Sequence, residues 1–224
     1  MAYLLGVDVG TSGTKALLID ESGKVVARAV SEYPLYTPKP LWAEQEPADW
    51  WRATCESIRE VLRQAGITGE QVQGVGLSGQ MHGSVFLDEN NQVIRPAILW
   101  CDQRTAAECA WITETVGRER VVELTSNPVL TGFQAGKIIW LRNNEPEAYA
   151  RVRKVLLPKD YIRYLLTGEY ATEVSDASGT SLFNVRKRQW ADEVLDAIGI
   201  PRQWMPRVYE SPEITGRITA EAAA

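Results

Sequence analysis

Short apolar runs separated by turn residues open the chain, a pattern typical of β-strands. Residues 3–8 are largely apolar, and residues 14–19 form a second run after a gap of only five residues. Residues 20–23 (Asp-Glu-Ser-Gly) have the composition of a turn, and residues 24–33 then alternate loosely between apolar and polar. Connections this short do not allow a crossover, so we expect a three-stranded antiparallel meander.

A helical period follows a proline-rich loop. Apolar or small side chains recur at spacings of three and four from Trp51 to Ala65, so one face of this segment is apolar. Pro47 suits the first turn of a helix, and Gly66 suits a C-terminal stop. We therefore expect a helix over residues 47–65.

Strand and helix patterns alternate through the rest of the chain. Apolar runs typical of strands lie at residues 72–78, 84–87, 94–100 and 155–157. Helical patterns lie at residues 102–116, 137–142, 160–166 and 191–198, and Pro146 begins another. We expect strand 72–78 to be buried and segment 137–142 to be amphipathic. Strands and helices in this order predict one α/β domain with a mixed sheet.

Composition narrows the class of protein. The 224 residues carry 24 basic and 29 acidic side chains, a net charge of −5, which argues against a nucleic-acid-binding protein. No apolar run approaches the roughly 20 residues that span a bilayer, and the first residues lack the basic region of a signal peptide, so we expect no membrane association. The three cysteines, Cys55, Cys101 and Cys109, fit neither a disulfide framework nor a metal pair. A cytoplasmic protein is the simplest interpretation.

The connection between the first two strands has the residues of a phosphate-binding turn. Gly10 and Gly13 allow backbone amides to turn toward an anion, and Thr11 and Ser12 add hydroxyl donors. Lys15 adds a mobile positive charge that suits phosphate. The turn is not a P-loop, because it lacks the G-x-x-x-x-G-K-[ST] pattern and leads into a strand. An ordinary tight hairpin would use the same residue types, and the spacing alone does not separate the two interpretations.

Asp8 precedes this turn at the end of the first strand. A carboxylate there could hold Mg²⁺ directly or through water, because Mg²⁺ prefers oxygen ligands and keeps several waters. We therefore name Asp8 as the candidate metal and catalytic residue.

The only histidine follows the predicted strand 72–78, between two glycines. Gln80, Met81 and His82 can all point into a cleft from this loop. Gln80 and His82 can donate to and accept from sugar hydroxyls, and Met81 can pack against an apolar sugar face. A structural histidine in an ordinary turn is the competing interpretation.

A third polar stretch follows the predicted strand 94–100. Arg104 could bind a hydroxyl cluster through its planar fork of donors. Asp102 could instead cap the helix that begins there, and Trp100 could belong to the core.

In combination these stretches resemble the FGGY family of carbohydrate kinases, from Tyr3 to about Gly216. Each matching stretch is weak alone, but their order and density are specific to the family. The matching stretches are residues 6–13, 41–45, 79–83, 95–100, 156–161, 167–169 and 175–180. Residues 133–141 resemble a family signature except at Gln134, where the family usually has Pro, Ser or Thr; we expect that position to be structural.

The resemblance implies an actin-like ATPase fold, in which two ribonuclease H-like domains face each other across a cleft. Residues 1–224 correspond to the N-terminal domain, with its three-stranded meander first. This domain supplies most of the sugar site, and the C-terminal domain, absent from this sequence, supplies most of the nucleotide pocket. By the same resemblance, Met81 and His82 contact sugar, with Gln80, Asp102 and Arg104 as neighbours. Thr11, Ser12 and Gly13 contact phosphate, and Asp8 lies near the metal and the γ-phosphate.

The Gln-Met-His stretch resembles family members that phosphorylate D-xylulose, whereas glycerol kinases carry an Arg-Glu pair in that loop. The resemblance thus implies transfer of the γ-phosphoryl of MgATP to the 5-hydroxyl of D-xylulose, with ATP and Mg²⁺ as cofactors. A kinase of another ketose or polyol, such as ribulose, and a sugar-binding domain without catalysis remain as alternatives. A homodimer is a further possible assembly.

Phosphoryl transfer usually needs a base for the hydroxyl proton. In this family the base is an aspartate in a glycine-rich stretch shortly after the N-terminal domain, and this sequence contains no such stretch. Asp8 is a poor substitute, because its better use is near the metal. We therefore expect the N-terminal half of a longer kinase, inactive by itself.

Overall fold

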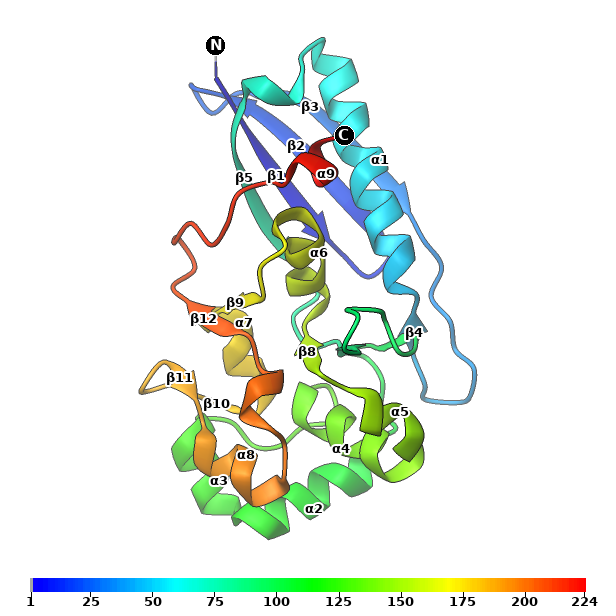
Figure 1. The fold of residues 1–224 in the computed structure, drawn as a ribbon, viewed down its shortest axis with the longest axis vertical. Helices are drawn as coiled ribbons and strands as arrows, with labels where there is room; N and C mark the ends of the chain where they lie inside the picture. The colour runs from blue at the N-terminus through cyan, green and yellow to red at the C-terminus, as the bar shows by residue number, and fades with distance from the viewer. Residues whose placement is uncertain (1) are drawn as a thin grey trace.

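Alternating residues at the start of the chain build a mixed sheet in the computed structural model, which describes residues 2–224. β1 (Tyr3–Val9), β2 (Gly13–Asp20) and β3 (Val25–Glu32) form an antiparallel meander. β5 (Val72–Gly79) pairs parallel with β1, which gives the strand order β3-β2-β1-β5. The predicted meander and mixed sheet are therefore confirmed (Figure 1).

One face of the sheet is covered by the long helix α1 (Pro47–Ala65), as Figure 1 shows. Leu5, Val7 and Leu18 point toward this helix and form a buried cluster with Val61. The helix ends as its sequence predicts, because Gly66 adopts the left-handed conformation at its C-terminus.

The opposite face of the sheet stays open within residues 2–224. Leu4, Leu17 and Val30 lie on it and are exposed. β5 is an edge strand of this half-covered sheet, and its residues are only partly buried. The prediction of a buried strand at residues 72–78 is therefore wrong, because an apolar run does not reveal whether a strand lies at an edge.

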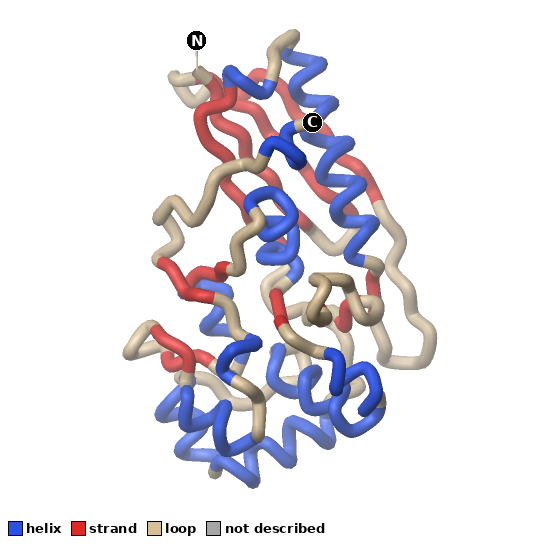
Figure 2. Tube along the Cα trace, viewed as in Figure 1, coloured by secondary structure: helices blue, strands red, loops and turns tan. Residues whose placement is uncertain are grey.

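A helical body lies below the sheet in Figures 1 and 2. Its core gathers side chains from α2 (Ala106–Val116), α4 (Gln134–Asn144) and α8 (Asp192–Ile198). Every residue from Gln134 to Leu141 is buried, so the prediction of an amphipathic helix there is wrong. Contacts with α2, α5 (Pro146–Arg151) and the 3-10 turn Ser178–Thr180 place α4 in the core, so its burial comes from tertiary packing.

Short elements connect the two parts, and their bounds differ in places from the prediction. The apolar run 94–100 forms a strand only at β7, and the helix expected from residue 102 begins at Ala106. The further strands are β4 (Glu44–Gln45), β6 (Val85–Leu87), β7 (Ala97–Ile98), β8 (Lys154–Leu156), β9 (Ala171–Glu173), β10 (Phe183–Asn184), β11 (Gln189–Trp190) and β12 (Arg207–Tyr209). The further helices are α3 (Arg118–Thr125), α5 (Pro146–Arg151), α6 (Pro158–Thr167), α7 (Val174–Ala177) and α9 (Ala220–Ala223), with 3-10 turns at Gly69–Gln71, Ser178–Thr180 and Arg202–Trp204. Among residues 2–224, no helix, including α1, is both long enough and apolar enough to cross a membrane.

Candidate active site

The phosphate turn and the loop that carries the only histidine lie side by side. β1 and β5 are parallel, so their carboxyl ends meet at one edge of the sheet, where Val9 pairs with Gly79. The amide of Gln80 donates to the carbonyl of Val9 at 2.9 Å. Two stretches 70 residues apart therefore meet in one place, and we call residues 10–13 the phosphate turn and residues 80–83 the sugar loop.

The phosphate turn is a tight hairpin, in which the amide of Gly10 donates to the carbonyl of Gly13 at 3.1 Å. Glycine is required at position 13 for space: a Cβ there would lie 2.7 Å from the carbonyl oxygen of Ser31. The hairpin that the pattern also allowed is thus present. Whether it binds phosphate depends on the direction of its amides.

The carbonyls of the turn are held from the protein side. The carbonyl of Gly10 accepts from Tyr33 Oη at 2.5 Å and from Gln80 Nε2 at 2.9 Å. The carbonyl of Thr11 accepts from Gln45 Nε2 at 2.7 Å. In a trans peptide the N–H points opposite to the C=O, so the amides of residues 11 and 12 point away from these partners. No hydrogen bond within residues 2–224 uses either amide, which leaves both free for an anion.

Gln80 differs from its predicted orientation. Its side chain is 4% exposed, and its Nε2 donates to Gly10 and to Gln45 Oε1 rather than pointing into a cleft. Gln45 also accepts from Trp50 Nε1 at 3.0 Å. Gln80 and Gln45 therefore hold the phosphate turn through hydrogen bonds from the protein interior. The role of Gln45 was missed, because glutamine next to a proline-rich loop carries no signal of its own.

Asp8 lies beside this turn on the open face of the sheet. Its Oδ1 accepts from Ser78 Oγ at 2.8 Å, and Lys15 lies opposite it in the strand register. The described residues contain no group of three or more acidic, histidine or cysteine side chains that could hold a metal. A single carboxylate can hold Mg²⁺ that keeps most of its waters, so Asp8 stays a predicted metal ligand.

In the sugar loop the side chain of Met81 is exposed, whereas the ring of His82 is packed against other residues. Met81 is 44% exposed, which leaves its side chain available to a ligand. The His82 ring packs against Phe133 with centroids 4.7 Å apart, and a Cβ on Gly179 would fall 2.1 Å from its Cε1. Burial, together with the nearby Lys137, lowers the pKa of His82 below its usual value. This shift favours the neutral imidazole, in which one ring nitrogen donates a hydrogen bond and the other accepts one.

Trp100 lies at the surface beside the phosphate turn and not in the core. Its side chain is 44% exposed, and its Nε1 donates to Thr11 Oγ1 at 3.0 Å. Because the Thr11 oxygen accepts from Trp100, the hydroxyl proton of Thr11 remains free to donate elsewhere. The sequence did not distinguish this exposed tryptophan from a core one.

Asp102 and Arg104 form a buried ion pair, not an exposed ligand contact. Arg104 donates to both oxygens of Asp102 and forms an ion pair with Glu44 at 2.7 Å, and its guanidinium lies 3.6 Å from the Trp42 ring centroid. Asp102 accepts from the amides of Ala43 and Arg104 and does not cap α2. The expectation that these two side chains reach the sugar, and the alternative that Asp102 caps a helix, are therefore not supported by the geometry.

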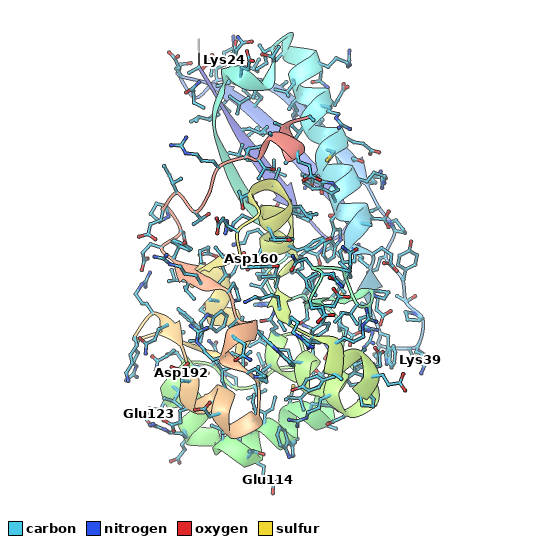
Figure 3. All side chains as sticks on the ribbon, in the orientation of Figure 1. Lys24, Lys39, Glu114, Glu123, Asp160 and Asp192 are labelled. Atoms are coloured by element: carbon cyan, nitrogen blue, oxygen red, sulfur yellow. The ribbon has the colours of Figure 1, made fainter. Side chains whose placement is uncertain are left out.

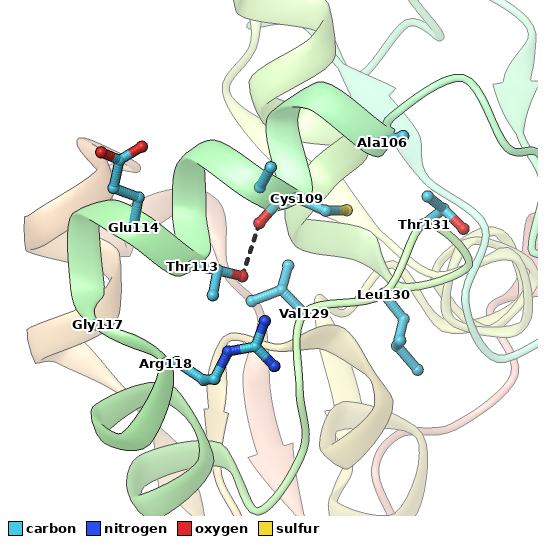
Figure 4. A pocket seen from close by; sticks show the side chains of 10 residues that line it. Ala106, Cys109, Thr113, Glu114, Gly117, Arg118, Val129, Leu130 and Thr131 are labelled. Atoms are coloured by element: carbon cyan, nitrogen blue, oxygen red, sulfur yellow. Dashed lines mark hydrogen bonds between the residues drawn. The ribbon is translucent and has the colours of Figure 1, made fainter.

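Two surface hollows lie apart from these loops. The larger, of about 680 Å³, lies between α2 and residues 129–131 (Figure 4). In that view Arg118 reaches toward Val129, and the Thr113 hydroxyl donates to the carbonyl of Cys109 at 2.8 Å. Neither hollow is lined by a predicted site residue.

Comparison with known proteins adds to this geometry. The family model of the N-terminal domain of FGGY carbohydrate kinases matches residues 3–224. The chain belongs to this family. It is 43% identical to the xylulose kinase of Escherichia coli K12 over 98% of its length and 45% identical to that of Lactococcus lactis over its full length.

Solved structures agree with the fold. The xylulose kinase structure from Rhodospirillum rubrum matches 99% of the chain with a TM-score of 0.93 and 29% identity. The predicted actin-like ATPase fold is therefore confirmed. The chain spans 44% of the length of the two curated relatives and 45% of that solved chain.

Proposed function

We propose that the full-length protein transfers the γ-phosphoryl group of MgATP to the 5-hydroxyl of D-xylulose, and that residues 1–224 supply its sugar loop and phosphate turn. The observation that carries the proposal is that these loops meet at one sheet edge. There Gln80 and Trp100 donate hydrogen bonds to Gly10 and Thr11 of the phosphate turn. The names of the relatives support xylulose as the sugar.

In this proposal the amides of Thr11 and Ser12 bind phosphate oxygens. The direction of these amides is fixed before ATP binds, because the carbonyls of the turn already accept hydrogen bonds from Tyr33 and Gln45. Donors fixed in advance need no reorganisation during the reaction. The Thr11 hydroxyl and the Lys15 ammonium add a donor and a positive charge at the same edge.

Asp8 would hold a hydrated Mg²⁺. The hydrogen bond that Ser78 donates to Asp8 fixes the orientation of this carboxylate. When bound, the metal neutralises charge on the phosphates. Asp8 does not serve as the base for the sugar hydroxyl in this proposal. That base and the nucleotide pocket come from the part of the protein that the relatives have beyond this chain.

The sugar lies on Met81 and His82. His82 is neutral and fixed in orientation, so it can donate to one hydroxyl or accept from another. Met81 offers an apolar side chain to the carbon face of the sugar. Gln80, Asp102 and Arg104 support the loops from inside and do not touch the sugar.

Product analysis with the full-length protein tests the proposal. D-xylulose and MgATP should yield xylulose 5-phosphate, with D-ribulose and glycerol as comparison substrates under the same conditions. A polar site can reject a sugar with one misplaced hydroxyl by orders of magnitude. Preferred turnover of D-ribulose would support a sister kinase instead. Sugar binding by calorimetry with no phosphorylated product would favour the domain without catalysis.

A further inference from the structure

Lys137 is buried directly beneath the sugar loop. It lies in the first turn of α4, and its side chain is 0% exposed. Its Nζ donates to the carbonyl of His82 at 2.7 Å and also to the carbonyl of Gly132. One ammonium group therefore joins the sugar loop to the start of α4.

This placement is unfavourable for a lysine. Burial lowers the pKa of Lys137 to about 7, although Asp102 acts in the opposite direction. The positive end of the helix dipole lies in the same first turn and also disfavours a cation. No carboxylate in the described part of the chain comes within ion-pair distance of Lys137. An apolar side chain would avoid this penalty, so the interaction with the two carbonyls is what the lysine provides.

A second contact from the same helix end reaches His82. Phe133, immediately before α4, packs its ring on the imidazole at 4.7 Å with the planes 42° apart. Gly179 closes the other side of the ring without room for a Cβ. The backbone of His82 is thus held by Lys137, and its ring is held between Phe133 and Gly179.

We propose that Lys137 and Phe133 are positioning residues for the sugar: Lys137 fixes the backbone of the sugar loop, and Phe133 fixes the imidazole. The inference rests on the proposed function of His82. Neither residue touches the sugar. In the proposed function each of them holds a residue that contacts the sugar and lies away from the phosphate turn, so loss of either contact should act mainly on sugar binding.

Steady-state kinetics of the full-length protein test this. Lys137→Met should raise the KM for D-xylulose by about tenfold or more, with kcat and the KM for MgATP changed less than about threefold. Phe133→Leu, at a half-buried position, should raise the same KM by a smaller factor. Arg142→Met is the matched control, because Arg142 is a cation of the same helix that donates to the distant carbonyl of Ile198.

A double-mutant cycle with His82→Ala separates positioning from general structural support. If Lys137 acts through His82, Lys137→Met should cost less sugar affinity in the His82→Ala background than in the unsubstituted protein. Equal costs in both backgrounds would overturn the proposal, as would a loss of kcat at unchanged KM.

Three further outcomes are decisive. If Lys137→Met does not fold, Phe133→Leu still tests the inference. An unchanged KM for D-xylulose in the Phe133→Leu variant would contradict it. If the unsubstituted protein phosphorylates D-xylulose and both variants bind it normally, the inference fails while the proposed function stands. If the unsubstituted protein forms no xylulose 5-phosphate, the proposed function itself has failed.

Discussion

At the scale of single residues, the direction of each side chain depends on partners far away in the sequence. Gln80, Met81 and His82 are consecutive, yet Gln80 turns inward to Gly10 while Met81 stays exposed. His82 lies between the two, with its ring held from α4 and from Gly179. In the proposed function, only the last two therefore contact the sugar.

Replacement of His82 by alanine tests this assignment. His82→Ala should weaken D-xylulose binding by about tenfold or more, because the site loses a fixed donor and acceptor. MgATP binding should change by less than about twofold, since the phosphate turn keeps its partners. Calorimetric titration of the full-length protein with each ligand measures both. Equal losses for the two ligands would count against a sugar role.

Trp100 allows a matched test of the phosphate turn. Trp100→Phe keeps an aromatic ring but removes the donor to Thr11, so we expect about a fivefold loss of kcat/KM for MgATP, equivalent to ~1 kcal/mol. Trp111→Phe is the control, because Trp111 is also partly exposed and contacts Arg142 on the helical body. The same loss in both variants would show that Trp100 has no special role at the turn.

At the scale of elements, local sequence sets where helices stop. Gly66 has φ 66° and ψ 32° at the end of α1, and its amide donates to the carbonyl of Arg63. This is the left-handed conformation that side chains with a Cβ adopt only at a cost. The helix end was therefore predictable from one glycine after an apolar period.

Gly66→Ala should lower the free energy of unfolding by about 1–2 kcal/mol, because alanine is strained in the left-handed region. For a chain of this size that corresponds to a fall in Tm of roughly 2–8 °C. Gly69→Ala is the control, because a Cβ on Gly69 meets no atom within 4 Å and its φ is not positive. Thermal unfolding of both variants gives the comparison, and equal effects would contradict the strain argument.

Buried charges connect α6 to β9 and α7. Lys159 forms ion pairs with Glu173 at 3.0 Å and with Asp176 at 2.7 Å, and its nitrogen lies 3.7 Å from Asp160 Oδ1. Asp160 itself is buried in the middle of the molecule, as Figure 3 shows. Burial raises the pKa of Asp160 to about 6, more than Lys159 lowers it.

This raised pKa gives a pH dependence with a defined sign. The folded protein binds the Asp160 proton more tightly than the unfolded chain, so the contribution to stability is present at low pH and is lost as the pH rises from about 4 to about 6. Asp160→Asn has no proton to lose. Its stability relative to the unsubstituted protein should therefore rise over this interval, as measured by urea unfolding at several pH values. A constant difference would show that Asp160 is charged throughout.

At the scale of the whole molecule, the candidate site brings together loops from two parallel strands at one edge of the sheet. Its loops lie at an open sheet edge, and the chain spans 44% of the length of its curated relatives. Phosphoryl transfer also needs a base and a nucleotide pocket. We place both in the remaining part of those longer proteins.

Residues 1–224 alone should therefore show no appreciable xylulose phosphorylation, whereas the full-length protein should be active. Parallel assays at equal concentration, with circular dichroism to verify that the shorter chain is folded, measure this. Turnover by the folded shorter chain would show that the base lies within residues 1–224, with Asp8 as the first residue to examine.

The sequence by itself determined the first strands, the helix Pro47–Ala65 and the family. These depend on local periods, on glycine and proline at element ends, and on motifs in a fixed order. It also named Asp8, the phosphate turn, Met81 and His82 as candidates, because polar residues after strands gather at a sheet edge. Their roles in binding stay predictions.

Only the tertiary structure decided which polar side chains face the site. Asp102 and Arg104 turn inward because their buried partners lie about 60 residues earlier in the sequence. Arg104 pairs with Glu44 and packs on the ring of Trp42, and Asp102 accepts from the amide of Ala43. Lys137 lies under the sugar loop because packing buries every residue of α4 from Gln134 to Leu141. A period along one helix or strand cannot predict such contacts, because the partners that compensate a buried charge come from other elements.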